Sequence, residues 1–363
     1  MAAQTVLAAV ITSVFTISGI LLKDFFLKRL EENRSDARLK SSIYERYSNP
    51  LATSSIEVLN RLSEILFAKH RPVYLKGKWS ASNPNAGGEF RAYKKLSTTY
   101  RLASMLGWLQ ACRREFSYLR VTDPRDGTKV ANAIDAFENA LADGSWVEQE
   151  RVTRLCELWQ LCSHDKVTKI ADLEGLGVKA DNLIWDHLEN AKLDDASLLS
   201  DAARRCLCRS IADCISAHLN TNQVSEEYMD KQLPYAFAIV GMRESWIYRD
   251  WQKAIGDIMV LPIDSDARRF EVIGYGAFEH LISEGTEEEK TALRRLLSIF
   301  EDLDLSIQDR FDSRPRQLRA IAQATAELLL ALYETQGRQT IIAEKSVKRA
   351  ETVIRQCKEA DQC

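Results

Sequence analysis

The strongest group of residues that could bind a ligand lies in the segment YRDWQKAIGDIM. If this segment is a helix, Arg249, Gln252 and Gly256 lie near one face, and Asp257 follows directly. A buried arginine could hold a phosphate or a carboxylate, and a glycine would admit close approach by a ligand or by another backbone. We favour the structural alternative, in which Arg249 pairs with an acidic residue in the core and Gly256 eases helix packing or a kink.

A second charged group, formed by Arg113, Arg114 and Glu115, stands near the end of a long predicted helix. The two arginines could meet an acidic ligand, and Glu115 could be the internal partner of Arg249. A solvated helix end with an internal ion pair is the favoured interpretation of this group. The rival hypothesis is a cryptic enzyme or an anionic-ligand binder that uses Arg249, Asp257, Arg113 and Glu115.

Cysteine and histidine residues offer a weaker candidate for a zinc site. Cys214 and His218 are four residues apart and would share a helix face, with Cys206 and Cys208 upstream. Zinc sites usually contain CxxC knuckles or a recognisable second pair of ligands, which this segment lacks. We therefore interpret the eight cysteines as free thiols in a reducing compartment, and we expect no metal and no cofactor.

Other motifs that could support catalysis are weak or missing. The segment GYGAF contains Gly274 and Gly276, but a lone GxG without a preceding strand or a Lys-Ser/Thr tail does not define a phosphate loop. A tight turn into the next helix explains this segment better. The chain has no HExxH, GxSxG or Walker sequence. A binding function is therefore favoured over an enzymatic one.

The elements that must position these residues are predicted to be helices. The chain of 363 residues has only 15 glycines and 7 prolines, and apolar residues recur at three- and four-residue steps in most segments. Thr286 and Glu289 have the spacing of a capping box, and Pro50 and Pro315 are placed to open helices. The fold class that we expect is all-α, with one N-terminal transmembrane helix followed by a helical-bundle-like cytoplasmic body.

The predicted membrane anchor is the N-terminal run of residues 1–22. It contains no charged side chain and would form a helix of about 33 Å, enough to cross a hydrocarbon core of about 30 Å. A cleaved signal peptide fits less well, because no basic side chain precedes the run. Lys23, Lys28 and Arg29 follow it and are expected at the membrane interface. The positive-inside rule then places the N-terminus outside and the body in the cytoplasm, at the bacterial inner (plasma) membrane.

Several segments together resemble a widespread family of uncharacterised bacterial proteins, whose members have an N-terminal membrane helix and a helical cytoplasmic domain. They are YSNPLATSSIEVLNRLSEIL, STTYRLASMLGWLQACRREFSYL, YRDWQKAIGDIM and GYGAF. The resemblance covers about residues 50–145 and 243–335, and it implies the anchor and the helical body but no activity. In the family a short connection joins these two regions. Here roughly a hundred residues intervene, which we interpret as an inserted helical subdomain.

These observations predict an organisation into five parts. They are a transmembrane anchor at 1–22, a juxtamembrane helix at 23–47, a discontinuous helical core domain at 48–145 and 242–335, an inserted helical subdomain at 146–241 and a C-terminal helix at 336–363. The net charge of −3 provides no field that would attract nucleic acid, so no nucleic-acid partner is expected.

The first functional hypothesis is a membrane-anchored helical sensor or scaffold that acts through protein–protein contacts. Its partners would be the lipid bilayer, through residues 1–22, and a protein bound by helix-in-groove or bundle contacts. Self-association as a homo-oligomer is also possible through the Ser/Thr-rich span, because small hydroxyl residues allow close helix packing. The alternative from another class is a membrane effector of a bacterial stress or phage-defence pathway.

Overall fold

The computed structural model describes residues 46–68, 88–116, 126–161, 170–193, 196–263, 268–301, 303, 305, 311–336 and 341–361. Most of these residues are helical, which confirms the predicted helical-bundle class. No helix in these ranges has the length and hydrophobicity that crossing a membrane requires. The predicted anchor at 1–22 and its flanking residues Lys23, Lys28 and Arg29 lie outside the described residues, so the transmembrane segment stays a prediction.

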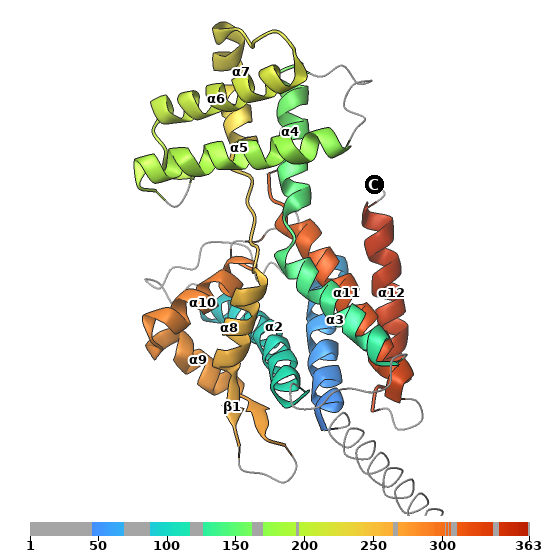
Figure 1. The fold of residues 1–363 in the computed structure, drawn as a ribbon. Helices are drawn as coiled ribbons and strands as arrows, with labels where there is room; N and C mark the ends of the chain where they lie inside the picture. Colours follow the sequence, from blue (N-terminus) through green and yellow to red (C-terminus); the bar gives the residue numbers. More distant parts are fainter. Residues whose placement is uncertain are drawn as a thin grey trace, which may run out of the picture.

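The larger part of the structure, which we call the core lobe, is a bundle of long helices (Figure 1). Within it, α11 packs against both α3 and α12, and α2 packs against α8. Buried side chains such as Leu59, Leu106, Phe137 and Leu329 form one continuous hydrophobic cluster. Its long helices are the one over 46–67, α2 (Gly88–Phe116), α3 (Asp126–Ala142), α8 (Arg249–Met259), α11 (Arg314–Gln336) and α12 (Glu344–Asp361).

The second part, which we call the insert lobe, comprises residues 145–240 and lies to one end of the core lobe (Figure 1). Its buried residues, from Val152 to Val240, form a hydrophobic cluster of their own within the range predicted for the inserted subdomain. Ser200 and Ser225 cap two of its helices with their hydroxyls. Its elements are α4 (Ser145–Leu158), α5 (Ile170–Ala191), η2 (Ala196–Leu198), α6 (Asp201–Leu219) and α7 (Glu226–Val240).

Contacts of α4 and of the returning chain join the two lobes. α4 runs out of the core lobe into the insert lobe (Figure 1). Arg151 of α4 is buried and forms ion pairs with Asp181 of α5 and with Glu244 of the returning chain, the latter at 3.3 Å. The backbone N–H of Ile247 then donates to the carbonyl oxygen of Leu141 at 2.8 Å. The buried Arg151 therefore joins the insert lobe to the chain that leaves it. The backbone hydrogen bond joins the segments of the core lobe that precede and follow the insert lobe.

A short hairpin departs from the all-α prediction. β1 (Val260–Pro262) follows α8 directly and pairs antiparallel with β2 (Phe270–Val272). The sequence predicts a helix up to Pro262, but α8 ends at Met259. The reason is local: proline disfavours the helical conformation of the residue before it, Leu261, and the β-branched Val260 is stiff. The hairpin packs against α2 and leads into α9 (Tyr275–Glu284).

Helix starts follow the sequence signals in two of three cases. The hydroxyl of Thr286 accepts from the N–H of Glu289, whose carboxylate accepts from the N–H of Thr286 at 2.8 Å, which confirms the capping box of α10 (Glu287–Ser298). Pro315 lies in the first turn of α11, as predicted. Pro50 does not open its helix, because the helix already contains residue 46 and runs on through the proline, so the predicted boundary at 47/48 falls inside one helix. Having no N–H, Pro50 costs that turn one hydrogen bond.

Candidate functional site

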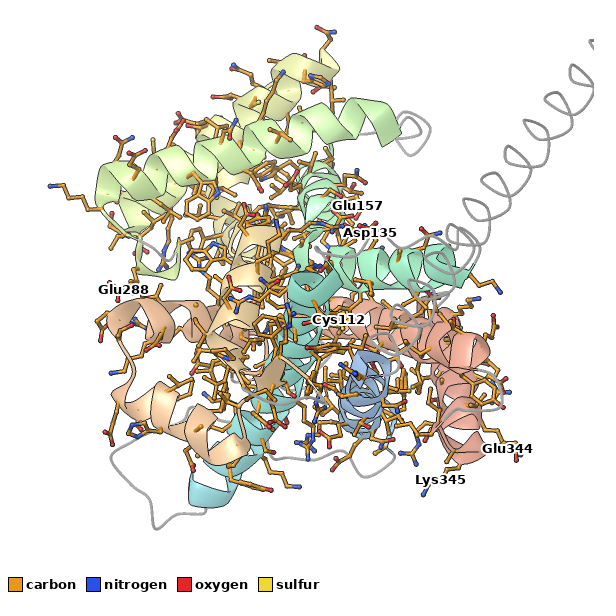
Figure 2. All side chains as sticks on the ribbon, turned by 60° about the horizontal axis from the view of Figure 1, so that its bottom comes forward. Cys112, Asp135, Glu157, Glu288, Glu344 and Lys345 are labelled. Carbon is orange, nitrogen blue, oxygen red and sulfur yellow. The ribbon has the colours of Figure 1, made fainter. Side chains whose placement is uncertain are left out.

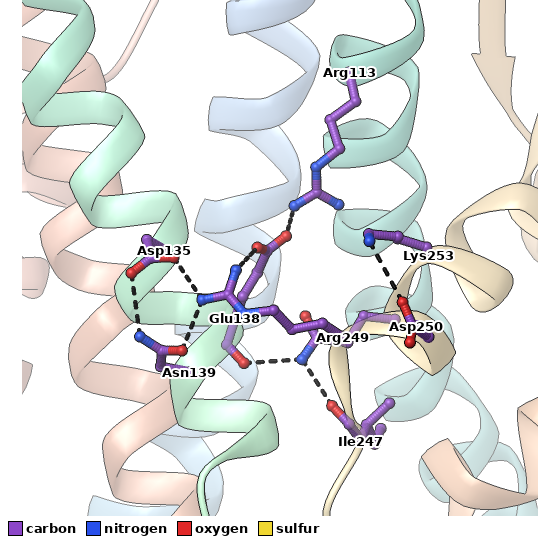
Figure 3. A network of polar contacts seen from close by, with 9 residues as sticks. Arg113, Asp135, Glu138, Asn139, Ile247, Arg249, Asp250 and Lys253 are labelled. Atoms are coloured by element: carbon purple, nitrogen blue, oxygen red, sulfur yellow. Dashed lines mark hydrogen bonds and ion pairs between the residues drawn. The ribbon is translucent and has the colours of Figure 1, made fainter.

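Arg249, the leading sequence candidate, is held in an ion-pair network between α8 and α3 (Figure 3). Its Nη1 donates to the Glu138 carboxylate at 2.6 Å, and its Nη2 donates to Asp135 at 2.5 Å and to the side-chain oxygen of Asn139 at 2.7 Å. Arg113 of α2 forms a second ion pair with Glu138. Both Nη atoms of Arg249 are therefore engaged by the protein, which supports the structural interpretation of this residue.

The network is electrically balanced around the Glu138 carboxylate. The Glu138 side chain is only 6% exposed, and the two guanidinium groups face it together with Asp135 at the rim. Burial, followed by the positive charge of Arg249, lowers the pKa of Arg113. Because an arginine stays protonated in proteins, the two guanidinium groups remain charged, and each faces a carboxylate of α3. Such an arrangement joins helices and offers little net charge to a ligand.

Gln252 and Gly256, on the inner face of α8, also have structural roles. The Gln252 side-chain amide donates to the backbone oxygens of Glu138 at 2.8 Å and Ile247 at 2.7 Å. A Cβ added at Gly256 would lie 2.7 Å from the Cβ of Gln110 and 3.0 Å from a backbone oxygen of α2. α2 and α8 therefore touch at this glycine, which leaves no room for a ligand there.

Asp257 and Arg114 form a separate pair on the surface. The Asp257 carboxylate accepts from Arg114 at 2.5 Å and from the Gln110 side-chain amide at 2.6 Å. Both charged side chains are more than a third exposed. Exposed pairs of this kind contribute little to stability, typically below about 1 kcal/mol.

Glu115 is not the partner of Arg249, and the suggestion from the sequence is wrong. Its carboxylate accepts from the Tyr47 hydroxyl at 3.4 Å and lies 4.0 Å from Nε of Arg269. Residues two apart on a helix do not share a face, so Glu115 cannot join Arg113 at α3. The four side chains of the enzyme hypothesis are thus divided among three separate contacts. None of the four lines either of the two cavities described below.

The candidate zinc ligands are also spread over several faces of α6. Cys206 and His218 are exposed, Cys208 is buried and Cys214 is half-buried. In the part of the chain that the structure describes, no three Cys, His, Asp or Glu side chains gather as a metal site would require. Burial raises the pKa of the Cys208 thiol to about 12, which keeps it protonated, whereas zinc binds the thiolate.

A groove suited to a ligand lies elsewhere on the core lobe, away from the candidate ligand-binding residues named from the sequence. It lies between the helix over 46–67, α2, α12 and the start of α9, and its volume is about 1150 Å³. Ligand pockets in proteins usually measure about 300–1,000 Å³. We call it the basic groove, and we define it by the cations Arg61, Arg101, Lys345, Lys348 and Arg349, the carboxylates Glu57 and Glu64, and the tyrosines Tyr93, Tyr100 and Tyr275.

Charge in the basic groove is unbalanced in favour of cations. Five cationic side chains face two carboxylates, an excess of three positive charges in a chain whose net charge is −3. Figure 2 shows where α12 contributes, with Glu344 and Lys345 at its start. Glu344 pairs with Lys348 at 2.8 Å and screens part of that excess. The remaining field favours an anion with several negative charges.

Arg61 is the one cation of the basic groove that is almost fully buried, with 4% of its side chain exposed. Its Nε donates to the Thr98 hydroxyl at 2.7 Å and its Nη1 donates to Glu64 at 2.6 Å. Its Nη2 is buried and has no hydrogen-bond partner. Leaving a buried charged donor unsatisfied costs roughly 1–3 kcal/mol or more. The groove wall thus contains a guanidinium held in place with one donor left over.

Arg101 and Arg349 have neutral partners. Nη1 of Arg101 donates to the backbone oxygen and the hydroxyl of Ser97, both at 3.3 Å. Nη1 of Arg349 donates to the side-chain oxygen of Asn60 at 2.6 Å. Among the described residues, neither arginine has a carboxylate partner. Their full charge is therefore available to a ligand.

A second cavity of about 600 Å³ adjoins the basic groove, and the two share Glu57 and Tyr100. The hairpin forms its far wall, where the guanidinium of Arg268 lies 5.3 Å from the centre of the Trp108 ring. This contact closes the cavity with a cation stacked on an aromatic face.

One signal in the sequence could have revealed the basic groove. Lys345, Lys348, Arg349, Thr352 and Gln356 follow three- and four-residue steps, so they lie on one face of α12. That the face meets Arg61 and Arg101, more than 240 residues earlier, follows from packing and not from spacing.

Comparison of the chain with protein-family models, curated proteins and solved structures gives no match. The resemblance to bacterial proteins with an N-terminal membrane helix therefore stays a prediction. The functional conclusion rests on the groove and the ion-pair network themselves.

Proposed function

We propose that the protein is a helical sensor that binds an anionic, phosphate-bearing ligand in the basic groove. The observation that carries this proposal is the excess of cations in the basic groove, where five cationic side chains, the buried Arg61 among them, face two carboxylates. Phosphate presents several oxygen acceptors, and guanidinium groups match its geometry through paired N–H donors. The sequence favours a sensor that acts through protein–protein contacts and offers anion binding at Arg249 only as a rival hypothesis; the anion site proposed here is the basic groove instead.

Binding in this groove rests on several weak charge interactions. Lys345, Lys348 and Arg349 are exposed, and ions in solution screen such side chains over about 8–10 Å at ordinary ionic strength. The ligand should therefore carry more than one negative charge, and its affinity should fall as salt is added. Arg61 and Arg101 lie deeper and would supply the hydrogen bonds that fix its orientation.

The proposal includes the membrane anchor expected at residues 1–22. An anchor so close to the helix over 46–67 would hold the basic groove near the bilayer. Fractionation of cells that express the full chain, beside a chain lacking residues 1–22, tests this part. We expect the full chain in the membrane fraction after a carbonate wash and the shortened chain in the supernatant, and equal distribution would refute the anchor.

Titration calorimetry of the full chain with inorganic tripolyphosphate tests the proposed binding. Arg349→Gln removes a cation from the basic groove, and we expect at least a five-fold loss of affinity. Arg355→Gln is the matched control, since Arg355 lies on the same helix, is exposed and does not line the groove. Failure of tripolyphosphate to bind, or equal losses in both variants, would refute the proposal.

Protein contact through the insert lobe is the second candidate. Val178 and Trp185 are seven residues apart on α5, so they share a face, and Trp185 is 64% exposed. A large exposed tryptophan beside a valine suits a protein interface. We take a second copy of the chain as the occupant, a different contact from the self-association through residues 1–22 that the sequence suggests. Sedimentation velocity of the wild type and of Trp185→Glu tests this: a dimer lost in the variant supports the candidate, and a wild-type monomer refutes it.

A further inference from the structure

A wall of tyrosines completes the basic groove at the end formed by α2 and the start of α9. Tyr93 meets Tyr275 edge to face, with ring centres 6.0 Å apart and an interplanar angle of 77°. Tyr100 meets Tyr275 in the same way at 5.5 Å and contacts Phe278 of the core. Phe278 is fully buried, so this chain of rings is anchored in the hydrophobic cluster. This end of the basic groove is therefore aromatic and is packed onto the core.

Two groups in this wall lack a full set of partners: the ring of Tyr93 and the hydroxyl of Tyr275. The Tyr93 ring is 49% exposed, and its edge-to-face contact with Tyr275 leaves a face open. The Tyr275 hydroxyl is buried without a hydrogen-bond partner, whereas the Tyr100 hydroxyl donates to the carbonyl oxygen of Ile273 at 3.1 Å. An open ring face suits a planar aromatic group.

We propose that the ligand of the basic groove is a nucleotide, with its base on Tyr93 and its phosphates among the cations. This inference rests on the proposed function and adds the base to the phosphate. Bases stack on aromatic side chains with little dependence on their identity, because every base has a flat π-face. The volume of about 1150 Å³ is far more than a phosphate alone would need.

The spacing along α2 fits such a ligand. Tyr93, Ser97 and Arg101 follow four-residue steps, so they share the face of α2 that lines the groove. Eight residues of helix separate the ring of Tyr93 from the guanidinium of Arg101 by about 12 Å along the axis. The separation leaves room for a sugar between a stacked base and the phosphates that Arg61 and Arg101 would bind.

Titration calorimetry with ATP and with inorganic tripolyphosphate, both in magnesium-free buffer, separates base from phosphate. We expect ATP to bind the full chain about ten-fold more tightly than tripolyphosphate. Tyr93→Leu keeps the apolar volume and removes the ring, so it should bring ATP to the affinity of tripolyphosphate and leave tripolyphosphate unchanged. Tyr235→Leu is the matched control, because Tyr235 is exposed on α7, away from the groove.

Each outcome decides between the two proposals. If tripolyphosphate binds and ATP binds no more tightly, the nucleotide inference fails and the anion-binding function stands. If neither probe binds, both fail. Dihexanoyl phosphatidic acid offers the phosphate of a lipid headgroup without a base, and tighter binding of this lipid than of ATP would overturn the inference. So would an unchanged preference for ATP in Tyr93→Leu.

Discussion

Arg113 of α2 and Arg249 of α8 both form ion pairs with the same carboxylate, that of Glu138 on α3. The consecutive helices α2 and α3 and the much later α8 therefore meet at a single side chain that is nearly sealed from water. Without Glu138, two like charges would face each other, and the charge of Arg249 already contributes to lowering the pKa of Arg113. Glu138 is the counter-ion that lets these helices pack together.

Replacing Glu138 with glutamine should therefore destabilise the fold. We expect Glu138→Gln to lower the free energy of unfolding by about 2–3 kcal/mol, somewhat less than for a fully buried pair because both arginines are partly exposed. Urea denaturation measures this difference. Asp257→Asn is the control, since it breaks an exposed pair and should cost less than about 1 kcal/mol. An equal loss of unfolding free energy in the two variants would contradict the role of Glu138 as the shared counter-ion.

Because α2 and α8 are in close contact at Gly256, we expect a larger side chain there to destabilise the fold. The added methyl of Gly256→Ala would lie 2.7 Å from the Cβ of Gln110, so the helices must separate, at a cost of about 1–3 kcal/mol. Gly276→Ala is the matched control, because nothing lies within 4 Å of its added Cβ, and a helical alanine should be neutral or stabilising. Thermal unfolding of both variants gives the comparison, and a Gly256→Ala protein as stable as the wild type would exclude tight packing there.

The parts of this fold that depend on local sequence were predictable. Three- and four-residue periodicity locates the helices, and the short side chains and hydroxyls at their ends set caps such as the one at Thr286. The structural interpretation of Gly256 could also be reached, because glycine within a helix has few other uses. The turn of α8 into β1 was missed, although Pro262 carries the relevant restriction on the preceding residue.

Partners of the charged residues could not be predicted. Arg249 lies 111 positions after Glu138, and only the crossing of α8 over α3 decides that it meets Glu138 and not Glu115. The basic groove poses the same problem. The basic face of α12 is visible in the sequence, but its meeting with Arg61 depends on how α11 places α12 beside the first described helix. The spacing of residues in the sequence shows which side chains share a helix face, but only the tertiary structure shows what that face contacts.

Acidic crowding at the base of the insert lobe predicts a pH-dependent stability. Burial raises the pKa of Glu148, and the carboxylates of Asp181 and Glu244 raise it further against the opposing charge of Arg151. The folded state then holds its proton more tightly than the unfolded state does, so this residue costs stability as the pH rises above the ordinary value of 4.5.

Glu148→Gln removes that cost. We expect the variant to be more stable than the wild type at pH 7, by less than about 1 kcal/mol because solvent screens the site. The gain should shrink to nothing as the pH falls well below 4.5, where Glu148 is protonated in both states. Urea denaturation at several pH values measures it, with Glu157→Gln on the same helix as an exposed control. A gain that does not change with pH would rule out titration of Glu148 as its source.

Cys206 and Cys208 should differ sharply in reactivity although one residue separates them. Cys206 is exposed on α6, whereas Cys208 is buried, and burial raises the pKa of its thiol to about 12. Alkylation requires the thiolate, so at pH 8 iodoacetamide should label Cys206 at least ten-fold faster than Cys208. Timed labelling followed by peptide mass spectrometry measures both rates in one experiment. In urea the two rates should converge, because unfolding exposes both thiols, and equal rates in the native protein would mean that α6 does not turn Cys208 into the core of the insert lobe.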